Sequence, residues 1–188
     1  MIYIIDHQDS FTWNVVHQFS EFDNVHCTNY FDIDKKILET AKTIVFSPGP
    51  GAPKDYSITS KIYRKYKGIK KIIGICLGFQ QILYCEKGKI TKQKNIYHGF
   101  QSKIKVVSKN SIFKKNRKFK VGRYHSLKLK EPFFAKNFDI TMRCEKTGVA
   151  MAFENHEDDV YGFQFHPESF LTANGKILIK KILSAKKS

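Results

Sequence analysis

A cysteine stands where an apolar strand is expected to turn into a helix. Cys76 follows the apolar run KKIIGI and precedes a second apolar segment, with Gly74 and Gly78 on either side. This G-x-C-x-G spacing matches a nucleophile elbow, in which the glycines permit a sharp turn and the close approach of a substrate. The N-terminus of the following helix favours a thiolate, and the backbone amide of Leu77 points toward any oxyanion formed there. We therefore predict that Cys76 is a nucleophile rather than an ordinary buried thiol.

A cysteine nucleophile needs a base, and the base needs a group that orients it. His166 follows the apolar run VYGFQF, and Glu168 lies two residues further on in HPES. Residues i and i+2 of an extended segment project to the same side, and Pro167 biases His166 toward extended geometry. We predict His166 as the base and Glu168 as its orienting group, with His125 in RYHSL as the rival base.

A loop rich in proline and glycine, SPGPGAP at residues 47–53, follows another expected strand. It exposes backbone amides, although a simple turn is the alternative, and it lacks the Gly-Lys-Ser/Thr ending of a P-loop. The seven histidines contain no HxH or HxxxH pair and the four cysteines no CxxC pair, so no metal site is predicted. The cysteines expected to be ordinary buried thiols are Cys27, Cys85 and Cys144.

The elements that position these residues alternate between strand and helix over the first 88 residues. This alternation predicts a parallel sheet with helices on both faces. Beyond it, period-two stretches over 90–129 and a hairpin formed by 149–155 and 160–165 predict an antiparallel extension. The expected strands of the first part are 2–5, 25–28, 43–46 and 70–75, and the expected helices of the chain are 10–19 (capped by Ser10), 58–66, 77–86 and 172–185.

Length and composition predict one globular domain, residues 1–188. With 41% hydrophobic and 14% aromatic residues, the chain can bury a core and is neither disordered nor fibrous. No apolar run approaches the ~20 residues that a membrane span needs. The opening MIYIIDHQDS lacks the basic stretch of a signal peptide. We expect a cytoplasmic protein without a membrane partner.

The formal net charge of +16 is concentrated in the middle of the chain. Residues 61–136 hold 22 Lys and Arg against only two acids, Glu86 and Glu131. Such a segment can bind nucleic acid. However, 29 of the 33 basic residues are Lys, whereas side chains that read phosphate and guanine are more often Arg. We therefore expect no nucleic-acid partner and interpret the segment as a solvated surface, or as one facing an acidic patch on a partner protein.

Five motifs, in order, resemble those of the class I, triad-type glutamine amidotransferases. They are YIIDHQDSFTWNVV, FSPGPGAP, GICLGFQ, RYHSL and GFQFHPES, and the match covers essentially the whole chain. The opening motif and the Thr172 that follows HPES resemble the branch that serves chorismate-using synthases, and the chain has no room for the synthase itself. The resemblance implies a three-layer, flavodoxin-like α/β fold with a mostly parallel sheet and an antiparallel extension.

The resemblance also implies a role for each predicted residue. Cys76 attacks the side-chain amide of L-glutamine, His166 relays protons, Glu168 orients His166, and no cofactor or metal is needed. The ammonia passes to a chorismate-binding synthase subunit, either anthranilate synthase of tryptophan biosynthesis or aminodeoxychorismate synthase of folate biosynthesis, or to both. The more remote alternatives are a basic binding protein and a silent regulatory subunit. The implied oxyanion hole consists of the amides of Leu77 and Gly51, and the implied glutamine-binding positions are Gly49, Pro50, Gly51, Gln80, Ser126 and Leu127.

Two positions depart from the pattern of this branch. Phe79 stands where GICLGFQ commonly has His, and His7-Gln8 replace the usual Asn-Tyr of the opening motif. We expect Phe79 to alter the packing of the elbow or a partner contact without loss of catalysis, and no role is predicted for His7.

Overall fold

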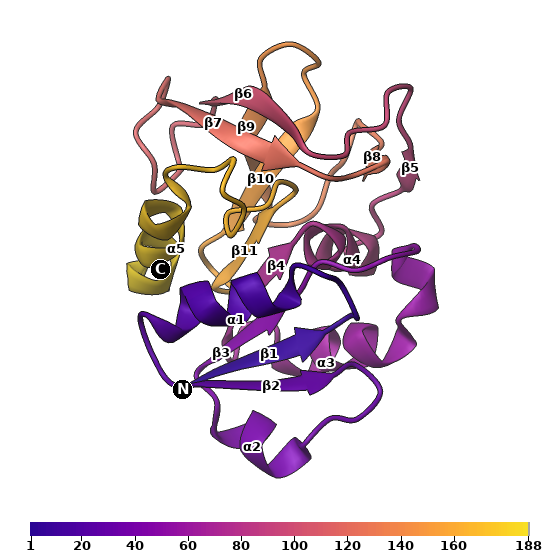
Figure 1. Ribbon diagram of the computed structural model, residues 1–188, viewed down its shortest axis with the longest axis vertical. Helices are drawn as coiled ribbons and strands as arrows, with labels where there is room; N and C mark the ends of the chain where they lie inside the picture. The colour runs from indigo at the N-terminus through magenta and orange to yellow at the C-terminus, as the bar shows by residue number, and fades with distance from the viewer. Residues whose placement is uncertain (188) are drawn as a thin grey trace.

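The computed structural model describes residues 1–187 and contains a nine-stranded mixed sheet flanked by helices (Figure 1). Its strand order is β2-β1-β3-β4-β11-β10-β9-β6-β7, and the strands up to β11 run parallel. The predicted α/β class, with a parallel sheet and an antiparallel extension, is confirmed. The parallel strands are β1 (Ile2–Asp6), β2 (Val25–Asn29), β3 (Thr43–Phe46), β4 (Lys71–Ile75) and β11 (Val160–Phe163).

Short apolar runs form the central strands because both faces of the sheet are covered. All residues of β3 and β4 are buried, and alternate side chains enter two separate cores. One core lies under α1 (Thr12–Ser20) and α5 (Gly175–Ser184), which contribute Phe19 and Leu178. The other lies under α2 (Lys35–Thr40), α3 (Ser57–Tyr66) and α4 (Leu77–Cys85). Within residues 1–187, no helix has the length and apolar character to cross a membrane.

The antiparallel part occupies the upper half of the view in Figure 1. The hairpin of β10 (Ala150–Asn155) with β11 is confirmed. The sheet then continues through a strand that the sequence pattern did not predict, β9 (Asp139–Cys144), which joins β10 to β6. The remaining strands are β6 (Phe100–Val106) and β7 (Lys118–Arg123) in this sheet, and β5 (Ile90–Lys92) and β8 (Leu127–Leu129) in a two-stranded sheet.

Two helix starts differ from the predictions. Helix α1 begins at Thr12, and the residue that caps it is Phe11, which makes no side-chain cap bond, so the prediction that Ser10 caps this helix was wrong. The Asp9 carboxylate accepts the Phe11 N–H at 2.8 Å, and such side chains compete for turn amides. Helix α5 begins at Gly175 rather than residue 172, because the Thr172 hydroxyl donates to the His166 carbonyl at 2.7 Å and stays in the preceding loop.

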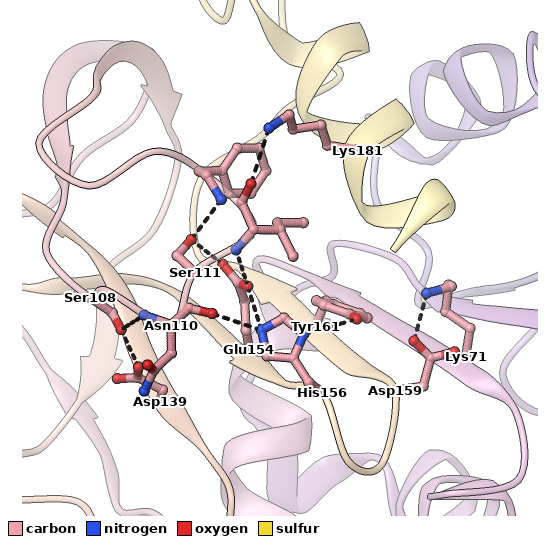
Figure 2. Close-up of polar contacts among 12 residues, drawn as sticks. Lys71, Ser108, Asn110, Ser111, Asp139, Glu154, His156, Asp159, Tyr161 and Lys181 are labelled. Carbon is pink, nitrogen blue, oxygen red and sulfur yellow. Dashed lines mark hydrogen bonds and ion pairs between the residues drawn. The ribbon is translucent and has the colours of Figure 1, made fainter. Parts of the chain in front are cut away.

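A buried carboxylate fastens the loop between β6 and β7 to the sheet (Figure 2). Glu154 on β10 is 2% exposed and accepts hydrogen bonds from the Ser111 hydroxyl at 2.5 Å and the Ile112 N–H at 2.9 Å. His156 Nε2 lies 3.0 Å from the same carboxylate and 3.1 Å from the Asn110 carbonyl. These hydrogen bonds offset the free-energy cost of removing the carboxylate from water.

Replacing Glu154 with glutamine should lower the free energy of unfolding by about 2 kcal/mol, since an amide cannot accept all of these bonds. Urea unfolding followed by circular dichroism measures the change. Glu157→Gln, at an exposed position two residues from the end of β10, is the matched control and should change stability little. Equal stability of the two variants would show that the Glu154 contacts contribute nothing.

Candidate active site

The segments predicted to do chemistry all follow the carboxyl ends of neighbouring parallel strands. Cys76 follows β4, the loop 47–53 follows β3, and His166 lies three residues beyond β11. Because β3, β4 and β11 are adjacent and parallel, these three segments meet at one edge of the sheet.

Cys76 adopts a left-handed backbone conformation at the end of β4. Its φ is 51° and its ψ is −98°, a combination that costs energy for any residue other than glycine. The Cys76 N–H donates to the Phe163 carbonyl at 2.8 Å, and the Cys76 carbonyl accepts the Gln80 N–H at 3.1 Å. The residue is thus held in the strained turn that the G-x-C-x-G spacing predicts for a nucleophile elbow.

Gly78 allows helix α4 to pack closely under this turn. A Cβ atom at this position would lie 2.2 Å from the Phe46 carbonyl oxygen at the end of β3. A Cβ on Gly74 would lie 2.5 Å from the backbone of Gly78. Larger side chains at either position would push the first turn of α4 away from Cys76.

His166 and Glu168 form a buried pair next to Cys76. His166 Nδ1 lies 2.6 Å from Glu168 Oε1, and the two side chains are 2% and 0% exposed. The rings of Phe11 and Tyr124 pack edge-on against the imidazole, with centroids 5.1 and 4.9 Å away. The imidazole is therefore held in one orientation, and its Nε2 has no hydrogen-bond partner among the residues described.

The surroundings of His166 favour its protonated form. Burial alone lowers the pKa of His166, but Glu168 and the Cys76 thiol outweigh burial and raise this pKa well above its usual 6.5. A positive imidazole beside a thiol is the setting in which a thiolate forms. The arrangement can supply both a nucleophile and an acid.

His125, the rival base, serves a different purpose. Its Nδ1 lies 2.8 Å from the Leu127 carbonyl, and its Nε2 accepts a hydrogen bond from Arg123 Nε at 3.0 Å. Burial and the adjacent Arg123 charge lower the pKa of His125 to about 3. The imidazole is therefore neutral, and both of its nitrogens have hydrogen-bond partners. It holds residues 125–127 in place and does not act as the base for Cys76.

A cavity of about 230 Å³ connects Cys76 with the predicted substrate positions. Leu77 opens α4, so its N–H has no partner within the helix. Gly51 has a φ of 73°, which favours glycine, and it stands in the same wall. His166 and Glu168 are buried and are not among the residues that line this cavity. The predicted residues that line the cavity are Gly49, Pro50, Gly51, Cys76, Leu77, Gln80, Ser126 and Leu127.

His7, to which the sequence assigns no role, supports the loop at residues 47–53. It is fully buried, with Nδ1 3.1 Å from the Ser47 carbonyl and Nε2 2.9 Å from the Thr59 hydroxyl. Burial lowers the pKa of His7 to about 4, so the ring is neutral and bridges the loop to α3. The one signal in the sequence is its departure from the usual Asn of the opening motif.

Phe79 and the other cysteines are explained by packing. Phe79 is fully buried against Phe153, with ring centroids 5.2 Å apart. Phe79 therefore contributes to the packing beneath the elbow and has no exposed surface that a partner could contact. Cys144 is buried as predicted, whereas Cys27 and Cys85 are only half-buried, because they face the margins of the core. Burial still raises the pKa of Cys27 to about 11 and also raises that of Cys85.

Comparison with known proteins agrees with this geometry. The sequence model of the family "Glutamine amidotransferase class-I" matches residues 3–185. Anthranilate synthase component 2 of Lactococcus lactis is 38% identical over 186 residues, which are 98% of this chain and 94% of that protein. Aminodeoxychorismate synthase component 2 of Klebsiella aerogenes is 32% identical over 187 residues, which cover 98% of this chain and all of that protein (100%).

A solved structure extends the comparison to the fold. A Thermoplasma acidophilum protein assigned to GMP synthase superposes with a TM-score of 0.84 at 21% identity, over 98% of this chain and 92% of that one. At this identity the likeness is one of fold. With the family model spanning nearly the whole sequence and full-length relatives above 30% identity, the chain belongs to the class-I glutamine amidotransferases.

Proposed function

We propose that this chain is the glutaminase subunit of a chorismate-using synthase, with Cys76 as nucleophile, His166 as proton relay and Glu168 as its orienting carboxylate. The observation that carries the proposal is the strained elbow of Cys76, which opens on the cavity while the His166–Glu168 pair lies behind it. L-glutamine is the substrate, and glutamate and ammonia are the products.

In the first half of the reaction, the Cys76 thiolate attacks the side-chain amide carbon of glutamine. The negative charge on the carbonyl oxygen is stabilised by the N–H groups of Leu77 and Gly51. His166 donates its Nε2 proton to the departing nitrogen, the C–N bond breaks, and ammonia leaves a glutamyl thioester on the sulfur. Glu168 stays ionised and stabilises the positive form of His166 before that transfer.

In the second half, a water molecule attacks the thioester. The now neutral His166 accepts a proton from this water, the same N–H groups stabilise the second oxyanion, and the C–S bond breaks. Glutamate leaves, and the protonated His166 again faces a thiolate. The net reaction consumes one water and one glutamine and forms one glutamate and one ammonia.

Gln80 and the segment 125–127 are proposed to hold the substrate. Gln80 Nε2 lies 3.4 Å from the Leu127 carbonyl and 3.0 Å from Gln164 Oε1, which leaves its own Oε1 to accept an N–H from glutamine. Ser126 and Leu127 line the same cavity, and His125 Nδ1 contacts the Leu127 carbonyl.

The names of the relatives support a synthase subunit as the partner. Both are named as second components, of anthranilate synthase and of aminodeoxychorismate synthase, and a second component implies a first. We place anthranilate synthase first, because that relative is the more similar of the two, and aminodeoxychorismate synthase second. One chain can also serve both.

The decisive experiment supplies the chain with each synthase subunit from its own organism, together with chorismate and glutamine. The chain alone should hydrolyse glutamine weakly, and the correct synthase should raise this rate about tenfold or more by favouring the productive conformation. Anthranilate fluorescence or 4-aminobenzoate formation identifies the synthase, and ammonium chloride in place of glutamine is the control. Full glutaminase turnover without a partner, or no glutamine-dependent product with either synthase, would contradict the proposal.

A further inference from the structure

A glutamine side chain outside the predicted site, Gln164, lies between the thiol of Cys76 and the side chain of Gln80. Gln164 follows β11, next to β4 and its elbow, and it is fully buried. Its Nε2 lies 3.8 Å from Cys76 Sγ, and its Oε1 lies 3.0 Å from Gln80 Nε2. Its backbone N–H donates to the Met151 carbonyl at 2.9 Å, which continues the sheet and fixes where the side chain begins.

The direction of these amides is set by the carbonyl of Leu127, which can only accept. Since this oxygen lies 3.4 Å from the Gln80 amide, the NH₂ end of Gln80 must face it, and the same NH₂ donates to Gln164 Oε1. The other end of the Gln164 amide, its NH₂, must then point at the sulfur. A flipped Gln164 would oppose two NH₂ groups and turn a carbonyl oxygen toward a thiolate.

A thiolate at this buried position needs hydrogen-bond donors. The Cys76 side chain is buried, with 7% of the residue exposed, and ionised groups in such surroundings are stabilised by hydrogen bonds, which are stronger to a charged atom than to a neutral one. His166 is the cation beside the sulfur, and Gln164 presents an amide N–H to it from β11. Once the thioester forms, the sulfur is neutral and this hydrogen bond loses most of its strength.

We infer that Gln164 is a further catalytic residue, whose side-chain N–H donates to Cys76 Sγ, stabilises the thiolate and links it to the substrate-binding Gln80. The inference rests on the proposed role of Cys76 as the nucleophile. It explains why two amide side chains are buried together beside the elbow, where they bond each other, the Leu127 carbonyl and the sulfur.

The test measures how fast iodoacetamide alkylates Cys76 as a function of pH in the full chain, by mass spectrometry of the Cys76 peptide. Gln164→Met keeps the length of the side chain but removes the donor. The midpoint of the alkylation profile should rise by about one pH unit, which makes alkylation below the midpoint about tenfold slower while the plateau at high pH is unchanged. Gln164→Glu keeps the acceptor for Gln80 and should raise the midpoint further, because a carboxylate then faces the sulfur.

Gln101→Met is the matched control, because Gln101 is exposed and its side chain donates to the Leu171 carbonyl, so the alkylation profile of this variant should equal that of the wild type. Thermal unfolding establishes which variants are folded, and Gln164→Glu provides the test should Gln164→Met unfold. An unchanged midpoint in either folded variant would overturn the inference, since a purely structural role alters stability but not thiol ionisation. A wild-type chain without glutaminase activity in its complex would instead overturn the proposed function, and the alkylation profile would still test Gln164.

Discussion

Replacing Cys76 with serine is expected to abolish glutamine-dependent product formation by the complex. A hydroxyl does not ionise beside His166 as a thiol does, so the loss should be at least about 10³-fold. Product formation from ammonium chloride should be unchanged, because that reaction takes place in the synthase subunit. Both rates are measured on the same purified complex, by glutamate release and by synthase product.

Cys144→Ser is the matched control for this experiment. Cys144 is a buried thiol on β9, three places from the elbow strand β4 in the sheet order. A serine there can still accept the hydrogen bond that Arg123 donates to its sulfur, so glutamine use should stay intact. A Cys76→Ser complex that used glutamine at the wild-type rate would show that the nucleophile lies elsewhere. Equal loss of both the glutamine-dependent and the ammonia-dependent reaction would point to an inactive synthase subunit, and co-elution of the two subunits in gel filtration shows that the variant complex assembles.

The sequence predicts the arrangement of the candidate site well where its residues are close together in the chain. The elbow depends on Gly74, Cys76 and Gly78, which are near neighbours in sequence. The His166–Glu168 pair likewise comes from one short segment, although Pro167 and Glu168 lie in a turn instead of the predicted extended backbone. Short apolar runs likewise predict β1, β3 and β4 to within a residue, because strands buried on both faces carry almost no polar side chains.

The sequence does not predict the role of a residue whose contacts come from distant parts of the chain. His7 supports the loop at residues 47–53 because β1 and β3 are neighbours, which brings Ser47 to its ring, and because α3 brings Thr59 there. Gln164 acquires its position from the pairing of β11 with β4, which are far apart in the chain. Strand β9 has a mixed pattern, DITMRC, and is held by β6 and β10 on either side, so no local period marks it.

The second large effect is expected from Glu168→Gln. This change keeps the shape of the side chain but removes the charge that holds His166 protonated at a distance of 2.6 Å. Burial then lowers the pKa of His166 without opposition from this carboxylate, and the amide no longer fixes one ring tautomer. Glutamine-dependent kcat should fall by about 10³-fold or more, with ammonia-dependent synthesis unchanged.

Stability against pH provides an independent measurement of the same charge. In the wild type, the pKa of His166 in the folded chain lies well above the usual 6.5 of an unfolded histidine. Its contribution to stability is therefore complete below pH 6.5 and is lost as the pH rises through the folded-state pKa, because the folded state then releases the extra proton. Glu168→Gln should weaken this decline, because only the Cys76 sulfur then opposes the effect of burial, whereas the exposed control Glu157→Gln should retain it in full. A Glu168→Gln chain with wild-type kcat and a wild-type decline in stability would show that the carboxylate does not act through His166.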